Sequence, residues 1–332
     1  MKRKGLCMGI FISRRILTAI LCIFAALCLN FIIIHAAPGD PVRILVGQDN
    51  PSPEVIEALT IKYGLDQPQY VQFFRYVGNL LRGDMGTSIY TGEPVSLMIL
   101  RRMGPTALLA LTAAVLAMVI GTAFGIFSGR RVGSKVDSAI GSISYLFDAM
   151  PGFWLGLMLI LIFASSLHIL PTAGMVDVRA DHEGFLRALD ILRHMALPVT
   201  TLTLTLIPYY MRISRAAVVQ ALGEDFITTL RAAGMPESKI YRTYVFRNAI
   251  LPTITVFGIQ MAYLVTGSAI VEIVFSWPGM GSFVMTAISR RDYPLLMGIY
   301  FILSISVAVM MIAVDLLYSA MDPRIRHTGV KE

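Results

Sequence analysis

Residues 220–252 read QALGEDFITTLRAAGMPESKIYRTYVFRNAILP and lie between two long apolar runs of the chain. The pattern predicts two helices separated by a break. Glu224 and Asp225 supply acidic side chains for a first helical turn, and Gly234 favours the end of that helix. Pro236 fits the first position of a second helix, which continues towards the apolar run that follows.

The first of these predicted helices is amphipathic. Phe226, Leu230 and Ala233 fall on one helical face, with Ile227 beside it. Such a helix can dock in a groove of a partner protein, which needs apolar anchors at helical spacing with polar flanks. The alternative is a loop that lies on membrane lipid, with Arg and Lys contacting headgroups. The residue types alone leave both interpretations open.

The composition around this loop is that of a membrane protein. Of the 332 residues, 56% are hydrophobic and 15% charged, whereas soluble chains carry about 25% charged residues. Six runs are uncharged apart from Asp148, and a membrane span needs about 20 mostly apolar residues. We therefore predict an all-α polytopic membrane protein with six transmembrane helices. The predicted spans are 16–34, 104–128, 139–167, 195–211, 249–271 and 293–314.

The fourth run is the weakest because Pro198 and Pro208 interrupt it. Neighbouring helices can satisfy the backbone groups that a proline frees, so we expect this run to be buried inside the bundle. The first run follows basic residues and could be a cleaved signal peptide. Its length, and the lack of an A-x-A site after it, favour an uncleaved anchor.

The distribution of Lys and Arg predicts the orientation. With both termini inside, the cytoplasmic segments 1–15, 129–138, 212–248 and 315–332 hold 17 of these residues. The outer segments 35–103, 168–194 and 272–292 hold 11 over far more chain. The positive-inside rule therefore places both termini in the cytoplasm. This bias accounts for the net charge of +7, and no nucleic-acid partner is implied.

The first outer segment is too long to be a simple connector. A rigid turn is expected at Pro38-Gly39-Asp40-Pro41, a short helix between Ser52 and Gly64, and a capping box from Asp66 to Gln69. An aromatic-rich stripe follows at helical spacing. It predicts either packing within the outer segment or a helix lying on the outer membrane surface. Its members are Tyr70, Phe73, Phe74, Val77, Leu80 and Leu81.

Asp148 falls inside a predicted span, and Glu272 falls at the outer end of another. Asp148 interrupts the third run, and a carboxylate there costs about 2.5–3.5 kcal/mol on insertion scales. It is expected either to be protonated and hydrogen-bonded in the core or to line a translocation path. Glu272 ends the fifth run, just before Trp277, which could be an interfacial tryptophan.

In the second run, Gly121 and Gly125 form a G-x-x-x-G pair, either a chance spacing or a helix contact.

The sequence offers no catalytic or metal-binding motif. Its three cysteines form no C-x-x-C pair, and no H-E-x-x-H occurs. Neither a G-x-x-x-x-G-K-[ST] loop for ATP phosphates nor a G-x-S-x-G elbow is present. We therefore expect no enzyme activity, cofactor or metal site in this chain.

The loop resembles the conserved cytoplasmic loop, the EAA loop, of ABC-importer permeases in the dipeptide, oligopeptide and nickel branch. The Glu-Ala-Ala triplet of the wider superfamily is replaced by Thr228-Thr229-Leu230, which is usual for this branch. Further strings are similar to the same branch from about residue 14 to residue 326. Asp148 departs from the pattern, where a small or hydroxyl residue is expected. The matching residues of the loop are Glu224, Asp225, Phe226, Ile227, Thr229, Arg231, Ala232, Gly234, Arg247, Asn248, Ala249 and Pro252. The other strings are the P-G-D-P turn, Asp84-x-Gly86-x-Ser88, Pro151-x-Phe153-Trp154, Glu272-x-x-Phe275-x-Trp277-Pro278-Gly279-x-Gly281, Arg291-Asp292-Tyr293-Pro294, Asp315 and Asp322-Pro323-Arg324.

This resemblance implies a type I ABC-importer permease fold over roughly residues 95–326, in the inner membrane of a prokaryote. It implies a second homologous permease, two ATP-binding subunits and an extracytoplasmic substrate-binding protein as partners. ATP hydrolysis would occur in the separate subunits, and the loop would dock in an ATPase groove. The expected coupling residues are Glu224, Asp225, Phe226, Leu230, Arg231, Ala232, Ala233 and Gly234. The expected translocation-path residues are Asp148 and Glu272.

Peptides are the predicted cargo, with nickel, glutathione or another small solute as alternatives. Nickel would favour His or carboxylate ligands along the path, and the predicted spans have nearly none. Asp148 could meet the amino group of a peptide. Two other functional classes are possible alternatives to an ABC-importer permease. An ion-coupled secondary transporter needs ionisable residues inside its spans, and an intramembrane enzyme needs a nucleophile with a base or a metal site. Only Asp148, Glu272 and Asp315 could serve the first, and nothing serves the second.

Overall fold

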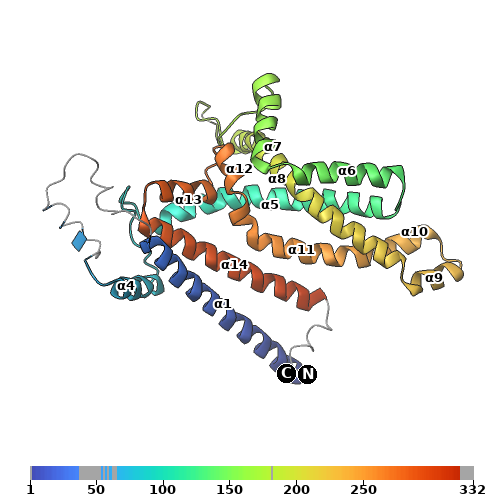
Figure 1. Cartoon of the computed structure of the whole chain (residues 1–332), viewed down its shortest axis with the longest axis horizontal. Helices are drawn as coiled ribbons and strands as arrows, with labels where there is room; N and C mark the ends of the chain where they lie inside the picture. The colour runs from blue at the N-terminus through green and yellow to red at the C-terminus, as the bar shows by residue number, and fades with distance from the viewer. Residues whose placement is uncertain are drawn as a thin grey trace. The chain divides into compact units, whose positions relative to one another are not determined.

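The computed structural model describes residues 2–36, 54, 57, 60, 61, 66–180 and 182–321, and these are almost entirely helical (Figure 1). The predicted turn at Pro38-Gly39-Asp40-Pro41, most of the predicted helix between Ser52 and Gly64, and Asp322-Pro323-Arg324 lie outside these residues. The chain divides into two compact units. One comprises Met1–Pro105, Gly279–Ile312 and Ser319–Glu332, and the other Thr106–Pro278 and Ala313–Tyr318.

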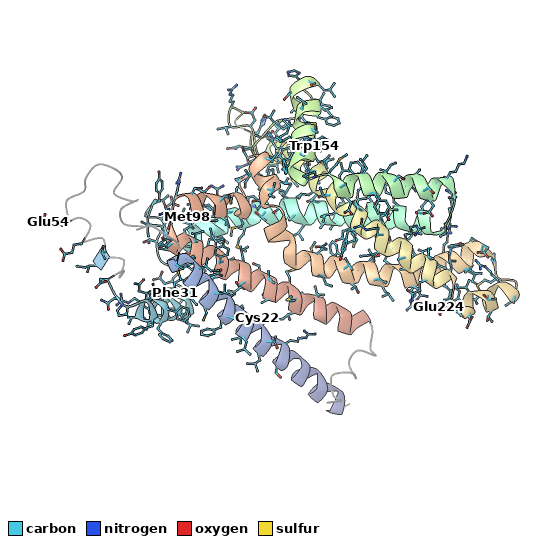
Figure 2. The ribbon with its side chains drawn as sticks, in the orientation of Figure 1. Cys22, Phe31, Glu54, Met98, Trp154 and Glu224 are labelled. Atoms are coloured by element: carbon cyan, nitrogen blue, oxygen red, sulfur yellow. The ribbon has the colours of Figure 1, made fainter. Side chains whose placement is uncertain are left out.

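The first unit contains α1 (Lys2–Ala36), α4 (Gln69–Leu81), the start of α5 (Val95–Gly129), α13 (Met280–Ser289) and most of α14 (Tyr293–Met321). The aromatic stripe lies on α4. The ring of Phe73 packs edge-on against α1, with its centroid 6.1 Å from that of Phe24 and 5.2 Å from that of Phe31. Figure 2 labels Phe31 on α1. Tyr70 and Phe74 remain exposed. One side of the aromatic stripe therefore packs on α1, which contains the first predicted span. The side chains on its other side are exposed.

The predicted capping box at the start of α4 is wrong. The residue that caps α4 is Pro68, which has no side-chain acceptor. The carboxylate of Asp66 instead accepts a hydrogen bond from the side-chain amide of Gln67, at 2.8 Å. The helix begins at Gln69 because the backbone of Pro68 is extended, with φ −54° and ψ 142°.

Asp292 determines where α14 begins. Its carboxylate accepts hydrogen bonds from the N–H of Leu295 at 3.3 Å, as an N-capping residue does, and from the N–H of Ile89 at 3.2 Å. The hydroxyl of Ser88 also donates to this carboxylate. Ser88 and Asp292 are both buried. Two strings that resemble the permease branch, Asp84-x-Gly86-x-Ser88 and Arg291-Asp292-Tyr293-Pro294, therefore meet at the N-terminal cap of α14.

The second unit is a helical bundle built on α8, a helix of 39 residues. Pro198 and Pro208 lie within α8 without breaking it, and the residues around them are buried, as predicted for the fourth run. The other helices of this unit are the rest of α5, then α6 (Lys135–Ala149), α7 (Gly152–Leu159), the π-helix η1 (Ile160–Ser166), α9 (Asp225–Ala232), α10 (Glu237–Lys239), the π-helix η2 (Ile240–Val245), α11 (Phe246–Gly267) and α12 (Ala269–Val274).

Glycines on α5 allow it to approach α8 closely. A Cβ on Gly121 would lie 2.8 Å from the carbonyl oxygen of Ile207, and one on Gly129 would lie 2.9 Å from Cβ of Val218. Gly125, between them, faces Ser214. The G-x-x-x-G spacing is therefore a specific helix contact, and it extends for one further step to Gly129.

The third predicted span is not a straight helix. Helices α6 and α7 meet at an angle of 99° across Met150 and Pro151. Pro151 disfavours helical geometry at the residue before it, and Met150 is extended, with φ −82° and ψ 126°. The fifth predicted span is likewise divided between α11 and α12, at Ser268.

Four helices in the described part of the chain are long and apolar enough to cross a membrane, and the bent pair raises this number to five. The four segments are Arg15–Ile34, Val95–Gly129, Gly184–Leu222 and Tyr293–Val314. Helices α5 and α8 extend well beyond the uncharged runs from which they were predicted. Their polar ends can continue the helix past the hydrocarbon layer, where side chains reach water again.

Candidate functional site

The predicted amphipathic helix is α9, and Gly234 ends it. The N–H of Gly234 donates to the carbonyl of Arg231 at 3.0 Å, and that of Met235 donates to the carbonyl of Leu230 at 3.1 Å. These two bonds form a Schellman motif, which requires a left-handed residue, and Gly234 has φ +77°. The prediction that this glycine stops the helix is confirmed.

The second half of the loop begins one residue later than predicted. Pro236 caps the next helix instead of occupying its first position, because its backbone is extended, with ψ 139°. Its carbonyl accepts hydrogen bonds from the N–H groups of Lys239 at 2.9 Å and Ile240 at 3.2 Å. Only one turn of α-helix follows before the chain winds into the π-helix η2 and then α11.

One residue anchors α9 to its own bundle. Ile227 is fully buried and lies in a cluster with residues of α8, η2 and α11. Leu230 is partly buried against the same cluster, whereas Phe226 is 38% exposed and its ring lies 6.4 Å from that of Tyr244. The predicted face of Phe226, Leu230 and Ala233 is therefore divided. The buried members of the cluster are Val218, Ala221, Ile227, Ile240, Val245 and Ala249.

The residues predicted to couple to an ATPase lie on α9 and at its two ends, and Glu224 marks its start in Figure 2. All of them except the half-buried Leu230 are exposed. Across the Gly234 turn, the guanidinium of Arg231 binds the carboxylate of Glu237, with Nε 2.6 Å from Oε1. This hydrogen bond lowers the pKa of Glu237 below its ordinary value. The exposed residues of the predicted set are Glu224, Asp225, Phe226, Arg231, Ala232, Ala233 and Gly234.

A polar network at the turn between α5 and α6 supports the same loop. Arg215 on α8 binds both oxygens of Asp137 on α6, each at 2.8 Å. Ser128 also donates to this carboxylate, as does the N–H of Gly133 at 3.0 Å. The guanidinium of Arg130 lies 4.2 Å from the ring centroid of Tyr241 in η2. The α5–α6 region therefore contacts both α8, which precedes the loop, and η2 in the second half of the loop.

The residue patterns do not predict this network, although the sequence carries a local signal for one part of it. Ser134 caps α6, and its hydroxyl accepts a hydrogen bond from the N–H of Asp137 at 3.2 Å. The spacing Ser-x-x-Asp is a known start signal for a helix. It identifies the cap but not Arg215, which lies far away in the sequence.

Asp148 lies at the end of α6 and forms an ion pair with Arg212 on α8. Nη1 of Arg212 is 2.7 Å from Oδ2, and Nη2 is 3.5 Å from Oδ1. The side chains of Asp148 and Arg212 are 46% and 38% exposed, so this carboxylate does not lie in the core of the chain. Asp148 lines a cavity of about 470 Å³ with apolar neighbours on α6, α7, α8 and α12.

Glu272 is fully buried in the second unit. Its Oε1 accepts hydrogen bonds from the hydroxyls of Thr106 at 2.8 Å and Ser268 at 2.9 Å. Trp277 is also fully buried and packs in a cluster with Leu109 and Leu197, so the interfacial placement of this tryptophan is wrong. The E-x-x-F-x-W string therefore holds the bundle together in this structure.

These features define a polytopic helical membrane component whose long polar loop presents a short, exposed helix. Residues 121–327 match the family described as binding-protein-dependent transport system inner membrane component, and residues 8–110 match its N-terminal part. The chain belongs to this family. It is thus a multi-pass inner-membrane permease of a binding-protein-dependent ABC importer, which works with an ATPase and a binding protein and is not itself an enzyme.

Three relatives are similar over nearly the whole chain. The oligopeptide transport system permease protein AppB of Bacillus subtilis is 36% identical over 325 residues, covering 96% of this chain and all of the relative. The di/tripeptide transport system permease protein DppB of Pseudomonas aeruginosa is 35% identical, covering 96% and 98%. The glutathione transport system permease protein GsiC of Escherichia coli is 34% identical, covering 96% and 99%.

The fold is similar to that of a solved transporter. A chain of the MetNI methionine ABC transporter, in an inward-facing conformation, superposes with a TM-score of 0.52 and 18% identity. The match covers 69% of this chain and 99% of the other. At this identity the likeness concerns the fold alone.

Proposed function

We propose that this chain forms half of the translocation path of an importer for dipeptides or oligopeptides. The observation that carries the proposal is α9, a helix held to its own bundle by Ile227 while its outer face stays exposed. An element anchored on one side and free on the other can transmit the motion of a partner to the spans. The relatives AppB and DppB are named for peptide transport, and GsiC for glutathione, which is itself a tripeptide.

The proposed topology has six spans with both termini in the cytoplasm. The long helices and the bent pair support the first four spans and the last, and α11 with α12 supports the fifth. The boundaries proposed from the apolar runs are 16–34, 104–128, 139–167, 195–211, 249–271 and 293–314. The orientation rests on the excess of Lys and Arg in the segments assigned to the cytoplasm.

The proposed assembly contains a second homologous permease, two ATP-binding subunits and an extracytoplasmic binding protein. The exposed residues of α9, from Glu224 to Gly234, would seat in a groove of one ATPase. ATP-driven closure of the two ATPases would then move α9, and the spans would alternate between outward and inward openings. Asp148 is proposed to line the path, and Glu272 to join it only when the contacts of its carboxylate open.

The experiment is ATP-driven peptide uptake by the complete transporter in proteoliposomes, with Gly234→Pro and Gly234→Asn variants. Proline fixes φ near −65°, so it cannot adopt the left-handed geometry of the Schellman motif, whereas asparagine tolerates it. We expect Gly234→Pro to insert normally but to lose uptake, and Gly234→Asn to keep most of it.

Two results would contradict the proposal. Unchanged uptake by Gly234→Pro would mean that the α9 turn does not couple the subunits. Uptake by the chain alone, driven by a proton gradient without ATP, would instead indicate a secondary transporter.

A further inference from the structure

Two Asp–Arg pairs join α6 to α8, and they differ in how completely they are satisfied. The carboxylate of Asp137 is buried and accepts hydrogen bonds from Arg215, Ser128 and Gly133. Arg212, by contrast, is the single hydrogen-bonding partner of Asp148 within the described part of the chain. A carboxylate offers about four acceptor sites and a guanidinium five donors, so the Asp148–Arg212 pair keeps several of both unused.

Stability does not explain the second pair. Asp148 lies in the last turn of α6, where the helix dipole disfavours a negative charge. Exposed ion pairs contribute only about 0–1 kcal/mol to folding. An acidic residue in an apolar segment of a membrane protein is costly, and such residues mark substrate paths more often than structural contacts.

Asp148 borders a cavity of suitable size for a small solute. The cavity that Asp148 lines has a volume of about 470 Å³ and walls that include Met150, Pro151, Leu202 and Val271. Cavities that hold small ligands typically measure about 300–1,000 Å³ and are mostly apolar, with a few polar groups that orient the ligand. Here the polar lining residues are Asp148 and Thr205, and the guanidinium of Arg212 lies 2.7 Å from the Asp148 carboxylate.

From this arrangement we propose that Asp148 and Arg212 form a binding site for a zwitterionic solute, with the ammonium group on Asp148 and the carboxylate on Arg212. A zwitterion can replace each partner of the ion pair by its own opposite charge, so neither side chain is left with an uncompensated charge. The charged ends of an extended dipeptide are about 7 Å apart, close enough for both to reach a pair that opens slightly. This inference rests on the proposed peptide cargo, and it extends the site from Asp148 to Arg212.

The test measures binding of dialanine, N-acetyl-dialanine and dialanine amide to the assembled permease–ATPase complex in nanodiscs, without the binding protein. Saturation-transfer NMR and competition give the relative affinities. We expect Asp148→Asn to weaken dialanine about tenfold, the effect of one charge-assisted contact, and to leave N-acetyl-dialanine unchanged. Arg212→Gln should weaken dialanine equally and leave dialanine amide unchanged. The matched control is Glu93→Gln, which breaks the exposed Glu93–Arg101 pair and should change none of the three.

Three outcomes overturn the inference: no binding of dialanine by the wild-type complex, no effect of either substitution, or equal weakening of all three probes. ATP-driven uptake with the binding protein is measured in parallel on the same complex. If uptake is normal and the terminal-group pattern is absent, the zwitterion site is wrong and the importer function stands. If ATP-driven uptake itself is absent, the importer function is contradicted.

Discussion

Arg215 on α8 binds both carboxylate oxygens of Asp137 on α6, with Nε 2.8 Å from Oδ1 and Nη2 2.8 Å from Oδ2. Such a two-point contact fixes orientation as well as distance, because the guanidinium plane must align with the carboxylate. Arg215 lies on the last turns of α8, just before the chain enters the loop that contains α9. The pair therefore controls where that loop begins relative to α6.

Asp137→Asn should destabilise the chain by about 3 kcal/mol. Removing one partner of a buried ion pair costs about 3–5 kcal/mol, and the lower value applies because Arg215 is partly exposed. Thermal unfolding in detergent measures the effect. The exchanged variant, Asp137→Arg with Arg215→Asp, should recover part of the loss; an exchanged variant no better than the single one would show that the pair itself contributes little.

Gly125→Val should disrupt the contact between α5 and α8. The added side chain would meet the Ser214 hydroxyl and the backbone of Met211. Overpacking a tight contact costs about 1–3 kcal/mol. The matched control is Gly104→Ala in the same helix, because no atom lies within 4 Å of the added Cβ there. Equal unfolding temperatures for the two variants would mean that the glycines do not set this contact.

Ser88→Ala should loosen the segment from Thr87 to Pro94 and the start of α14. The substitution removes the hydroxyl that Asp292 binds and leaves its buried carboxylate with fewer donors. Losses of this kind cost about 1–3 kcal/mol. Hydrogen exchange should rise at Ile89 and Leu295, with little change in α9. Uniform exchange changes across the chain would argue against a local cap.

The Arg231–Glu237 pair should respond to acid. Arg231 lowers the pKa of Glu237, so the contribution of this pair is complete above the ordinary pKa of glutamate, about 4.3. This contribution is lost as the pH falls through the lowered pKa that Glu237 has in the folded chain. The pair is exposed, and the effect should be confined to the Gly234 turn. A lower protection factor for the N–H of Met235 in acid, after correction for the intrinsic exchange rate, is the expected result, and Glu237→Gln should reproduce it at neutral pH. No difference in protection between Glu237→Gln and the parent would contradict it.

Much of the loop could be predicted because its signals are local. An acidic first turn, an apolar stripe and Gly234 specify α9 within one short segment, and the structure agrees on its end. The prediction of which face of α9 is buried failed, because two adjacent apolar residues could each occupy the buried position. Phe226 and Ile227 are adjacent and both apolar, and only the position of α8 and η2 decides that Ile227 is buried and Phe226 is not.

The membrane class of the chain, its long helices and the helix and Gly234 turn of the 220–252 loop follow from patterns within the sequence, since hydropathy and turn chemistry act over a few residues. The kink at Pro151 is also local in cause, although its angle of 99° is not readable from the residues. The pairs Asp137–Arg215 and Asp148–Arg212 were decided by tertiary packing alone. Their partners are 78 and 64 residues apart in the chain, and they meet only because α6 packs along α8. An ion pair depends on distance and geometry in space, and a sequence records neither.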